Sequence, residues 1–161
     1  MKRWLVIAGW FVPLAAGAQL PLPSFAALGG VTHYNLNGSG NTAIGALRAD
    51  LPLFSLRLEG SVAVMRPHEN DGTRTFVIPE AQLQYQLFPF LVQPYIGIGG
   101  GVFDAVAGPD PHRRDATFSA SAGVRVGAPL IGVGLRAEAR ARGIGSGFSR
   151  SATELTIGLS F

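Results

Sequence analysis

The last ten residues, from Ala152 to Phe161, alternate between apolar and polar positions. Leu155, Ile157 and Leu159 fall on one face of an extended strand, and Glu154 falls on the other face. A period of two predicts a β-strand that is apolar on one side. A strand that crosses a membrane needs only about ten such residues. This segment therefore has the length and the pattern of a membrane-spanning strand.

Seven earlier segments are also interpreted as strands, and the connections between them are of two kinds. Three short connections are apolar and contain Pro52, Pro89 or Pro129. The other four, at residues 37–41, 67–74, 104–116 and 143–151, are rich in Gly, Asn, Asp, Ser and charge. Short turns that alternate with longer polar loops predict four hairpins. The eight predicted strands span residues 25–36, 42–50, 55–66, 75–87, 93–103, 117–127, 131–142 and 152–161.

Most of these strands have a clear apolar face, but the alternation in the first two is too weak to decide which way they face. Pro79 lies within the fourth strand, where it cannot donate to the ladder, so we expect a bulge or a local break there. The glycines of the fifth strand can relieve crowding or let the strand coil. They do not have the G-x-G-x-x-G spacing of a phosphate-binding loop, and no helix follows them.

Alternation alone fits a soluble barrel or sandwich as well as a membrane barrel with apolar residues outside and polar residues inside. The apolar turns, the signal-like start of the chain and the aromatic last residue favour the membrane. Aromatic residues also gather near the strand ends, as in the girdles of membrane barrels. We expect one rim from Phe54, Tyr85, Phe88, Phe90, Tyr95 and Phe161, and the outer rim from Tyr34, Phe76, Phe103 and Phe148.

The first 18 residues have the layout of a secretory signal. A basic start at Met1 to Arg3 precedes an apolar run from Trp4 to Leu14, and Ala16-Gly17-Ala18 is a small-residue cleavage site. The apolar run is shorter than the roughly 20 residues that a spanning helix needs. We therefore expect residues 1–18 to be removed and residues 19–161 to form one barrel domain.

Charge and cysteine content exclude several classes of function. The full chain has a formal net charge of +3, and removal of Lys2 and Arg3 leaves eleven arginines against ten acidic residues. Such a balance is not the basic footprint of a nucleic-acid-binding protein. The chain has no cysteine, so it has neither disulfides nor thiolate metal sites. We expect no cofactor and no metal.

The signal, the four hairpins, the PYIGIGGG stretch at residues 94–101 and the terminal Phe161 resemble the small eight-stranded outer-membrane β-barrels, a family that includes the OmpA membrane domain and OmpX. The resemblance implies an all-β, antiparallel, up-and-down transmembrane barrel in the outer membrane of a Gram-negative cell. It also implies a monomer that contacts membrane lipid and lipopolysaccharide, and a sorting signal at Phe161 that the barrel assembly machinery reads. OmpA has a peptidoglycan-binding domain after its barrel; we expect none here, and so no cell-wall anchoring.

An eight-stranded barrel encloses a lumen just wide enough for side chains to fill. The predicted facing directs four arginines and four glutamates inward, and buried charges persist only when they are paired. We therefore expect a polar plug and a role in membrane structure or integrity, with a narrow or gated pore as an alternative. The eight residues are Arg57, Glu59, Glu80, Arg125, Arg136, Glu138, Arg140 and Glu154.

Enzymatic activity is a weaker alternative, because some outer-membrane barrels modify lipid A. Such chemistry needs a nucleophile with an adjacent base. The three histidines, His33, His68 and His112, fall near the predicted outer rim, where serines also lie. The lipid A deacylases are similar in size, but their His-x-Ser-Asn stretch is missing here. We interpret the histidines as solvated loop residues and predict no enzyme.

Surface binding is the remaining alternative. The predicted loop at residues 104–116 is the longest, and loops on a rigid scaffold often carry function. Its arginines could meet anionic lipopolysaccharide and its acids a divalent cation, although a solvated charged loop explains the composition equally well. The candidate binding residues are Asp110, His112, Arg113, Arg114 and Asp115.

Overall fold

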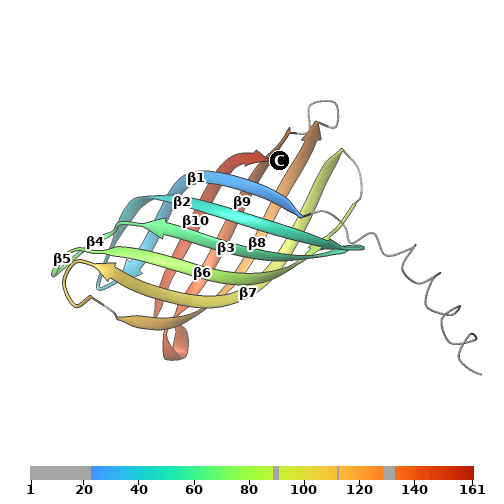
Figure 1. The fold of residues 1–161 in the computed structure, drawn as a ribbon. Helices are drawn as coiled ribbons and strands as arrows, with labels where there is room; N and C mark the ends of the chain where they lie inside the picture. The colour runs from blue at the N-terminus through green and yellow to red at the C-terminus, as the bar shows by residue number, and fades with distance from the viewer. Residues whose placement is uncertain (1–22, 89–90, 112, 129–132) are drawn as a thin grey trace, which may run out of the picture.

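Eight long antiparallel strands close into one barrel (Figure 1). The computed structural model describes residues 23–88, 91–111, 113–128 and 133–161. Each strand pairs with its neighbours along the chain, and the last strand pairs with the first. The predicted fold is confirmed. The barrel strands are β1 (Ser24–Leu36), β2 (Gly38–Leu53), β3 (Leu56–Met65), β6 (Thr75–Gln86), β7 (Val92–Ala107), β8 (Arg114–Ala128), β9 (Val133–Ile144) and β10 (Arg150–Ser160).

The barrel closes between β1 and β10. Their register begins with Ala26 opposite Ser160. Beyond this ladder the backbone N–H of Phe25 donates to the carbonyl of Phe161 at 2.7 Å, and the N–H of Phe161 donates back at 2.9 Å. Closure pairs the edges of the sheet, which a membrane requires because lipid cannot hydrogen-bond to exposed backbone groups.

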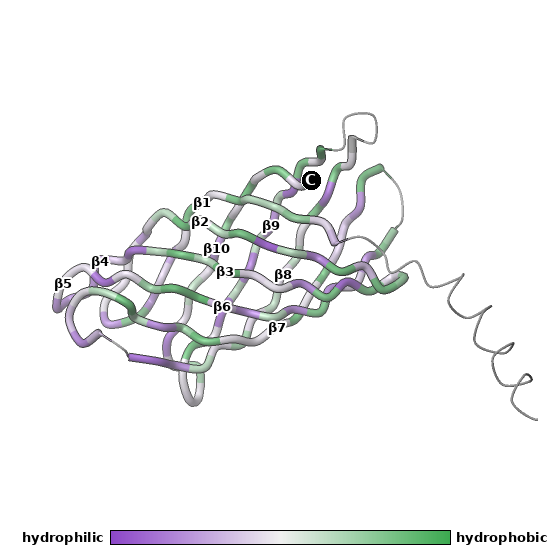
Figure 2. Tube along the Cα trace, in the orientation of Figure 1, coloured by the Kyte–Doolittle hydropathy of each residue, from purple (hydrophilic) through white to green (hydrophobic). Residues whose placement is uncertain are grey.

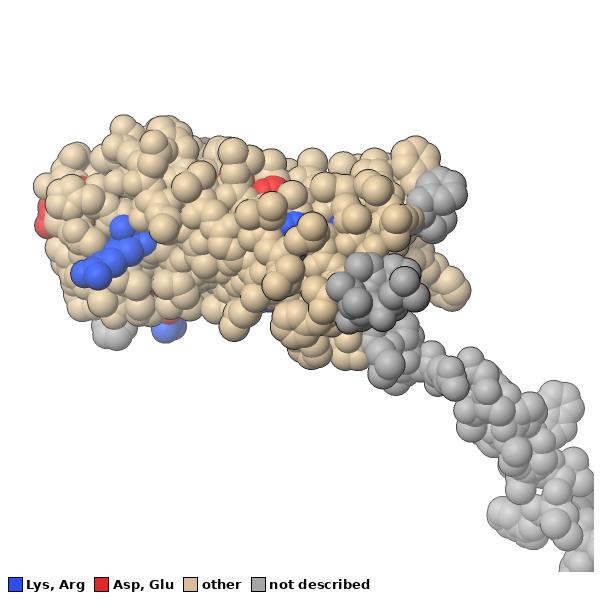
Figure 3. Space-filling model, turned by 90° about the horizontal axis from the view of Figure 1, so that it is seen from above, with Lys and Arg blue, Asp and Glu red and all other residues tan. Residues whose placement is uncertain are grey.

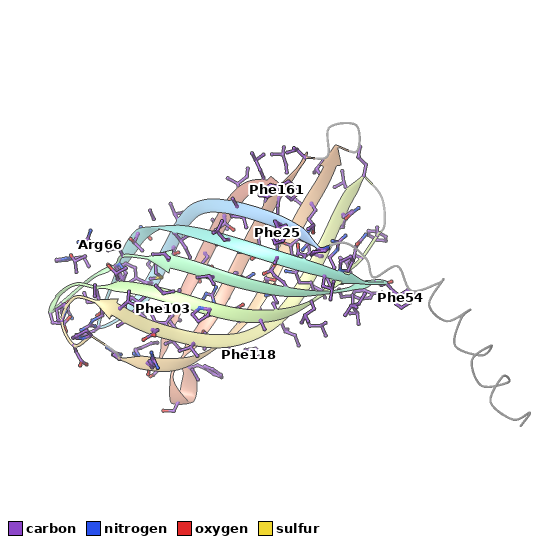
Figure 4. The ribbon with its side chains drawn as sticks, viewed as in Figure 1. Phe25, Phe54, Arg66, Phe103, Phe118 and Phe161 are labelled. Carbon is purple, nitrogen blue, oxygen red and sulfur yellow. The ribbon has the colours of Figure 1, made fainter. Side chains whose placement is uncertain are left out.

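The two ends of the barrel differ. The turn end contains the start of β1, the end of β10 and the connections that follow β2, β6 and β8. The loop end contains a short hairpin of β4 (His68–Glu69) and β5 (Gly72–Thr73), the connection between β7 and β8, and the 3-10 turn η2 (Ser146–Phe148). Figure 4 shows Phe54 and Phe161 toward the turn end and Arg66 toward the loop end.

The outer wall of the barrel is apolar and the inner wall is mostly polar. Leu47 and Ile157 point outward with 68% and 63% of their surface exposed, whereas Arg136 points inward and is 1% exposed. The hydropathy alternates along the strands in Figure 2, and the wall seen in Figure 3 has few charged atoms. A soluble barrel would show the opposite arrangement. This barrel is therefore built to span a membrane.

The first two strands, whose facing the sequence left open, follow the same rule. Thr32 on β1 and Arg48 on β2 are buried inside the barrel, while Val31 and Leu47 are exposed on its outer wall. The register pairs Ala46 of β2 with Leu28 of β1, both of which are buried. Both strands therefore contribute a mixed inner face and an apolar outer face.

Three of the predicted polar connections are more ordered than expected. β2 already begins at Gly38, so most of the predicted loop 37–41 is strand. β7 and β8 extend past their predicted ends, which reduces the predicted loop 104–116 to residues 108–113. The segment 67–74 contains the β4–β5 hairpin. Much of the sequence at these three connections is therefore paired strand.

Pro79 interrupts the ladder on one side of β6. Toward β3 the pairing is continuous, with Val62 opposite Pro79. Toward β7 the pairing stops at Val77 and resumes at Glu80. Because proline has no N–H to donate, the predicted local break occurs where it sits.

Glycines of β7 make room for large side chains in the lumen. A Cβ on Gly97 would lie 2.9 Å from Cγ of Gln84 and 2.9 Å from Oγ of Ser121. A Cβ on Gly99 would lie 2.7 Å from the carbonyl oxygen of Ala81. The prediction that these glycines relieve crowding is confirmed, and the space that they leave is used by the glutamines of β6.

The predicted aromatic rims are only partly correct. Phe54, Tyr85, Phe88 and Phe161 are exposed near the turn end, and Phe148 is exposed at the loop end. Phe90 lies outside the described residues. The assignment of Tyr34, Phe76, Phe103 and Tyr95 to the rims is wrong, because these four residues occupy inward positions of their strands and are 1–3% exposed. Closeness to a strand end does not decide which face a residue takes, whereas the period of two does.

Candidate functional site

Two buried glutamates, Glu59 on β3 and Glu138 on β9, form the centre of the lumen. Both carboxylates contact the same three arginines, which are Arg48, Arg136 and Arg140. The carboxylate of Glu138 lies 2.6 Å from the first, 2.8 Å from the second and 2.9 Å from the third. All five side chains are at most 1% exposed. Each buried charge therefore has several opposite charges within reach, the condition under which buried ions are tolerated.

The network continues toward the loop end through Arg142. Glu80 accepts from Nη1 of Arg140 at 2.7 Å and also pairs with Arg142. The hydroxyl of Ser119 donates to Glu80 at 2.6 Å. Nε of Arg142 donates to Glu154 at 2.5 Å. The carboxylate of Glu80 is thus held by two arginines and a hydroxyl.

The network continues toward the turn end through Asp50 and Tyr95. The guanidinium groups of Arg125 and Arg136 each lie 3.3 Å from Oδ2 of Asp50. The hydroxyl of Tyr95 donates to Glu138 at 2.5 Å and accepts from Nε of Arg136 at 2.8 Å. The Arg125 guanidinium lies 4.1 Å from the centre of the Tyr95 ring, a cation–π contact that fixes its orientation.

A short repeat on β9 supplies much of this charge. From residue 136 to residue 142 the sequence reads RAEARAR. In a strand, every second residue points to the same face, so Arg136, Glu138, Arg140 and Arg142 all enter the lumen. The alanines between them point toward the outer wall. One strand therefore presents three positive charges and one negative charge to the carboxylates of its neighbours.

An apolar layer lies between this ionic network and the loop end. Met65, Phe76 and Phe103 are at most 2% exposed in it, and the two phenylalanine rings are 4.3 Å apart. The hydroxyl of Tyr34 donates to the backbone carbonyl of His68 at 2.7 Å, which ties the layer to the hairpin above it. The lumen therefore contains two layers of different chemistry, the ionic layer in the middle and the apolar layer toward the loop end.

A cavity of about 510 Å³ opens at the turn end. We call it the vestibule, and it is bordered by Ser24, Asp50, Arg57, Gln93, Arg125 and Ser160 among others. Arg57 is half-buried and makes no ion pair with the described residues. Nε of Arg57 and both Nε and Nη1 of Arg125 are buried without a hydrogen-bond partner in the described protein.

The structure brings together seven of the eight charges that were placed in the lumen from the sequence: Glu59, Glu80, Arg125, Arg136, Glu138, Arg140 and Glu154. The eighth, Arg57, borders the vestibule instead. Arg48, Asp50 and Arg142 were missing from the predicted set. The signal for the first two was present, because they are two residues apart on β2 and alternate with the apolar Leu47 and Ala49.

The predicted loop-binding residues are largely paired with neighbouring charges. Asp115 accepts from Arg150 at 2.6 Å and from Arg113 at 3.3 Å. Arg114 pairs with Asp104 at 3.1 Å across the β7–β8 ladder. These contacts join strand ends and leave little unpaired charge for a ligand.

The remaining candidates do not gather into one site. Asp110 is exposed in the connection between β7 and β8, and His112 lies outside the described residues. The ring of His33 contacts the side chain of Asn41 at 3.0 Å, and the ring of His68 contacts the hydroxyl of Thr73 at 2.9 Å. Both rings are exposed, as expected of solvated histidines.

Two other kinds of site were sought in the described part of the chain. It contains no helix that is long and apolar enough to cross a membrane. It also contains no group of three or more His, Cys, Asp or Glu side chains placed to hold a metal ion.

Solved structures with the same fold are small outer-membrane barrels. The crystal structure of Neisserial surface protein A is similar with a TM-score of 0.71 at 17% identity, over 86% of this chain and 94% of that one. Ail, the attachment invasion locus protein of Yersinia pestis, is similar in its crystal structure with a TM-score of 0.51 at 15% identity, over 88% and 99%. Its structure in a phospholipid bilayer nanodisc gives 0.53 at 16%, over 86% and 99%. The fold is that of the small eight-stranded outer-membrane β-barrels. No family model and no curated protein matches the sequence.

Proposed function

We propose that this protein is a closed structural barrel of the bacterial outer membrane, whose lumen is plugged by its own side chains. The observation that carries the proposal is the centre of the ionic layer, where Glu59 and Glu138 share three arginines. Water and ions cross a lumen only where polar groups are free to exchange partners. Here the side chains at the centre are at most 1% exposed and bound to one another. The barrel thereby adds a rigid, non-conducting element to the membrane.

Conductance across a planar lipid bilayer tests the plug. We expect the purified barrel, refolded in detergent, to give no steady current after insertion. A general porin inserted in the same bilayers is the control for detection. A large and steady current from the barrel would contradict the plug and favour the small pore.

The proposed membrane is the outer membrane, with the turn end toward the periplasm. The outward apolar wall and the aromatic terminal strand support this placement. We expect the protein in the outer-membrane fraction of cells, with a mobility on gels that changes on heating.

A Phe161→Ala variant should reach that fraction in smaller amounts if the barrel assembly machinery reads the last strand. Unchanged amounts would remove the sorting role of Phe161.

The signal is proposed to be cleaved after Ala18. Residues 1–22 lie outside the described part of the chain, and β1 begins soon after them at Ser24. Mass spectrometry of the protein from the outer membrane should give a chain that starts at Gln19. The same purified sample should behave as a monomer in light scattering, as the resemblance to the small eight-stranded barrels implies.

Surface binding is the second candidate, and one observation favours it. Arg66 is exposed at the loop end and makes no ion pair with the described residues, and Arg114 is exposed there beside its partner Asp104. Arg66 above all could meet the anionic groups of lipopolysaccharide or a host surface. The Yersinia pestis neighbour is named for attachment and invasion. Adhesion of whole cells to extracellular matrix tests this role. If it holds, an Arg66→Ala, Arg114→Ala variant should lose adhesion at equal surface abundance, and a Ser39→Ala variant should not.

A further inference from the structure

The charges on the inner wall of the barrel do not balance. Among the described residues, six arginines and five carboxylates point into the lumen. The arginines are Arg48, Arg57, Arg125, Arg136, Arg140 and Arg142, and the carboxylates are Asp50, Glu59, Glu80, Glu138 and Glu154. Five of the arginines make ion pairs with these carboxylates. Arg57 is therefore the one lumen arginine without an ion pair to the described residues, and it lies in the vestibule, which Phe161 with its terminal carboxylate also borders.

Arg125 is held in place at the same vestibule. It is 7% exposed, and its Nη2 contacts Asp50 at 3.3 Å and also donates to Gln84. Its guanidinium group lies over the ring of Tyr95. These contacts use one nitrogen and leave Nε and Nη1 without a protein partner. A buried guanidinium group is thus fixed in orientation while part of its donor edge is unused.

The surroundings of the two arginines favour an anion. Asp50 is the one acidic side chain among the described residues that line the vestibule. Its Oδ2 is engaged by Arg125 and Arg136, whereas its Oδ1 is buried without a hydrogen-bond partner among the described residues. Gln93 and the hydroxyl groups of Ser24 and Ser160 border the same space and can donate further hydrogen bonds.

We propose that the vestibule binds a phosphate group between Arg57 and Arg125. A guanidinium group presents N–H donors in a planar fork that matches the oxygens of phosphate, and such charge-assisted bonds are stronger than neutral ones. A bound phosphate group accepts from the guanidinium groups of both arginines. Because Nε of Arg57 and Nε and Nη1 of Arg125 are buried, the two side chains must turn toward the vestibule to use them. Access from the periplasm rests on the proposed orientation, but the site itself does not. The group belongs to a free anion or to the headgroup of a membrane phospholipid.

Nuclear magnetic resonance of the arginine Nε–Hε groups tests the site directly. The barrel, labelled with ¹⁵N-arginine, is placed in dodecyl maltoside micelles, which carry no phosphate. Inorganic phosphate is titrated at constant ionic strength against a sodium chloride control. We expect saturable shifts of the Arg57 and Arg125 signals with phosphate. Shifts that do not saturate, or that chloride reproduces, would overturn the proposal.

Two variants separate the site from general electrostatics. Arg57→Gln should weaken the apparent phosphate affinity reported by Arg125 by about tenfold or more, because it removes one charged bond. Arg66→Gln removes the same charge at the exposed loop end and should leave the affinity unchanged. Arg57→Lys should give an intermediate affinity, since lysine keeps the charge and loses the fork. Equal losses in Arg57→Gln and Arg66→Gln would overturn the proposal.

A second arm identifies the source of the phosphate group. The same protein is placed in bicelles that contain phosphatidylglycerol, in a buffer without phosphate. If both arginine signals already lie at their saturated positions, the lipid headgroup is the ligand. If they move only when inorganic phosphate is added, the ligand is a free anion. If neither preparation gives the saturated positions, the site is refuted. Planar-bilayer conductance, which tests the plug, is measured separately, so failure of one proposal is distinguishable from failure of the other.

Discussion

The ionic layer and the apolar layer occupy the same lumen by different physical means. In the ionic layer, Glu138 contacts Arg48, Arg136, Arg140 and the Tyr95 hydroxyl. The stability of this layer therefore depends on the charged partners being present. In the apolar layer, Met65 and its neighbours need no partners and depend on filled volume. The first arrangement fails when a charge is removed, and the second fails when a cavity is made.

The position of each layer explains why both are needed. The apolar layer lies toward the loop end, where it keeps water from the ionic layer on that side. Exclusion of water strengthens each interaction between charges, because the effective dielectric constant falls. At the turn end no such layer covers the charges, and the vestibule opens there. Within the described lumen, the open end has one arginine without an ion pair, Arg57. The covered end has no such arginine. The absence of an apolar layer at the turn end accounts for this difference.

Removal of the Glu138 carboxylate should have the largest effect. A Glu138→Ala variant leaves three buried arginines without one of their anions, and breaking a buried pair costs about 3–5 kcal/mol. Urea unfolding in liposomes, followed by circular dichroism, measures the free energy of unfolding. Tryptophan fluorescence does not serve here, because both tryptophans, Trp4 and Trp10, lie in the predicted signal.

The control for this variant is Glu138→Gln, which keeps the shape and one acceptor but not the charge. We expect it to lose less stability than Glu138→Ala, because the amide oxygen still accepts from an arginine. A free energy of unfolding for Glu138→Ala within 1 kcal/mol of the native value would contradict a tightly coupled ionic layer.

A cavity in the apolar layer should cost somewhat less. Met65 is 1% exposed, and a buried Met→Ala change costs about 2–5 kcal/mol through lost transfer energy and the cavity that it leaves. The matched control is Met65→Leu, which conserves volume and should cost less than about 1.5 kcal/mol. Both are measured by the same unfolding assay. If the two substitutions have equal effects, filled volume is not what stabilises the layer.

The barrel was predictable from the sequence because its signal is repeated in strand after strand. The β9 stretch from residue 136 to residue 142 shows this most clearly, since charge and alanine alternate without interruption. The period of two fixes the facing there, and neighbouring strands then supply the opposite charges. The lumen charges on β3, β6, β8 and β10, and those on β9 except Arg142, were assigned in this way.

The same reasoning failed where small and polar residues hide the alternation. The predicted second strand, residues 42–50, begins with small and polar residues, so its facing was left open. Arg48 and Asp50 were therefore not placed, although they alternate with Leu47 and Ala49. The apolar layer was missed for a different reason. Phe76 and Phe103 are aromatic residues near strand ends, which is also where a lipid-facing girdle lies. The period of two separates these two positions, because Phe76 shares a face with the inward Glu80 and Phe103 shares a face with the inward Tyr95.

Loss of one hydroxyl from the ionic layer should have a smaller effect. Ser119 donates to Glu80 at 2.6 Å, and Glu80 keeps two arginines when that hydroxyl is removed. A Ser119→Ala variant should therefore lose about 1 kcal/mol, near the net value of an ordinary hydrogen bond. Chemical unfolding in the same liposomes measures it. A loss as large as that of Glu138→Ala would mean that the whole layer acts as one cooperative unit.

The smallest effect is expected at Arg57, and it tests whether the two ends of the lumen differ as described. Arg57 makes no ion pair with the described residues and borders the open vestibule. The Arg57→Gln substitution therefore leaves no buried carboxylate without its positive partner. In phosphate-free buffer its free energy of unfolding should stay within about 0.5 kcal/mol of the native value, as for substitutions away from buried networks. In buffer with phosphate the native barrel should gain more stability than the variant, because a ligand that binds only the folded state shifts unfolding by mass action and the variant binds it more weakly. A loss of several kcal/mol without phosphate would place Arg57 inside the ionic layer and remove the contrast between the covered and the open end.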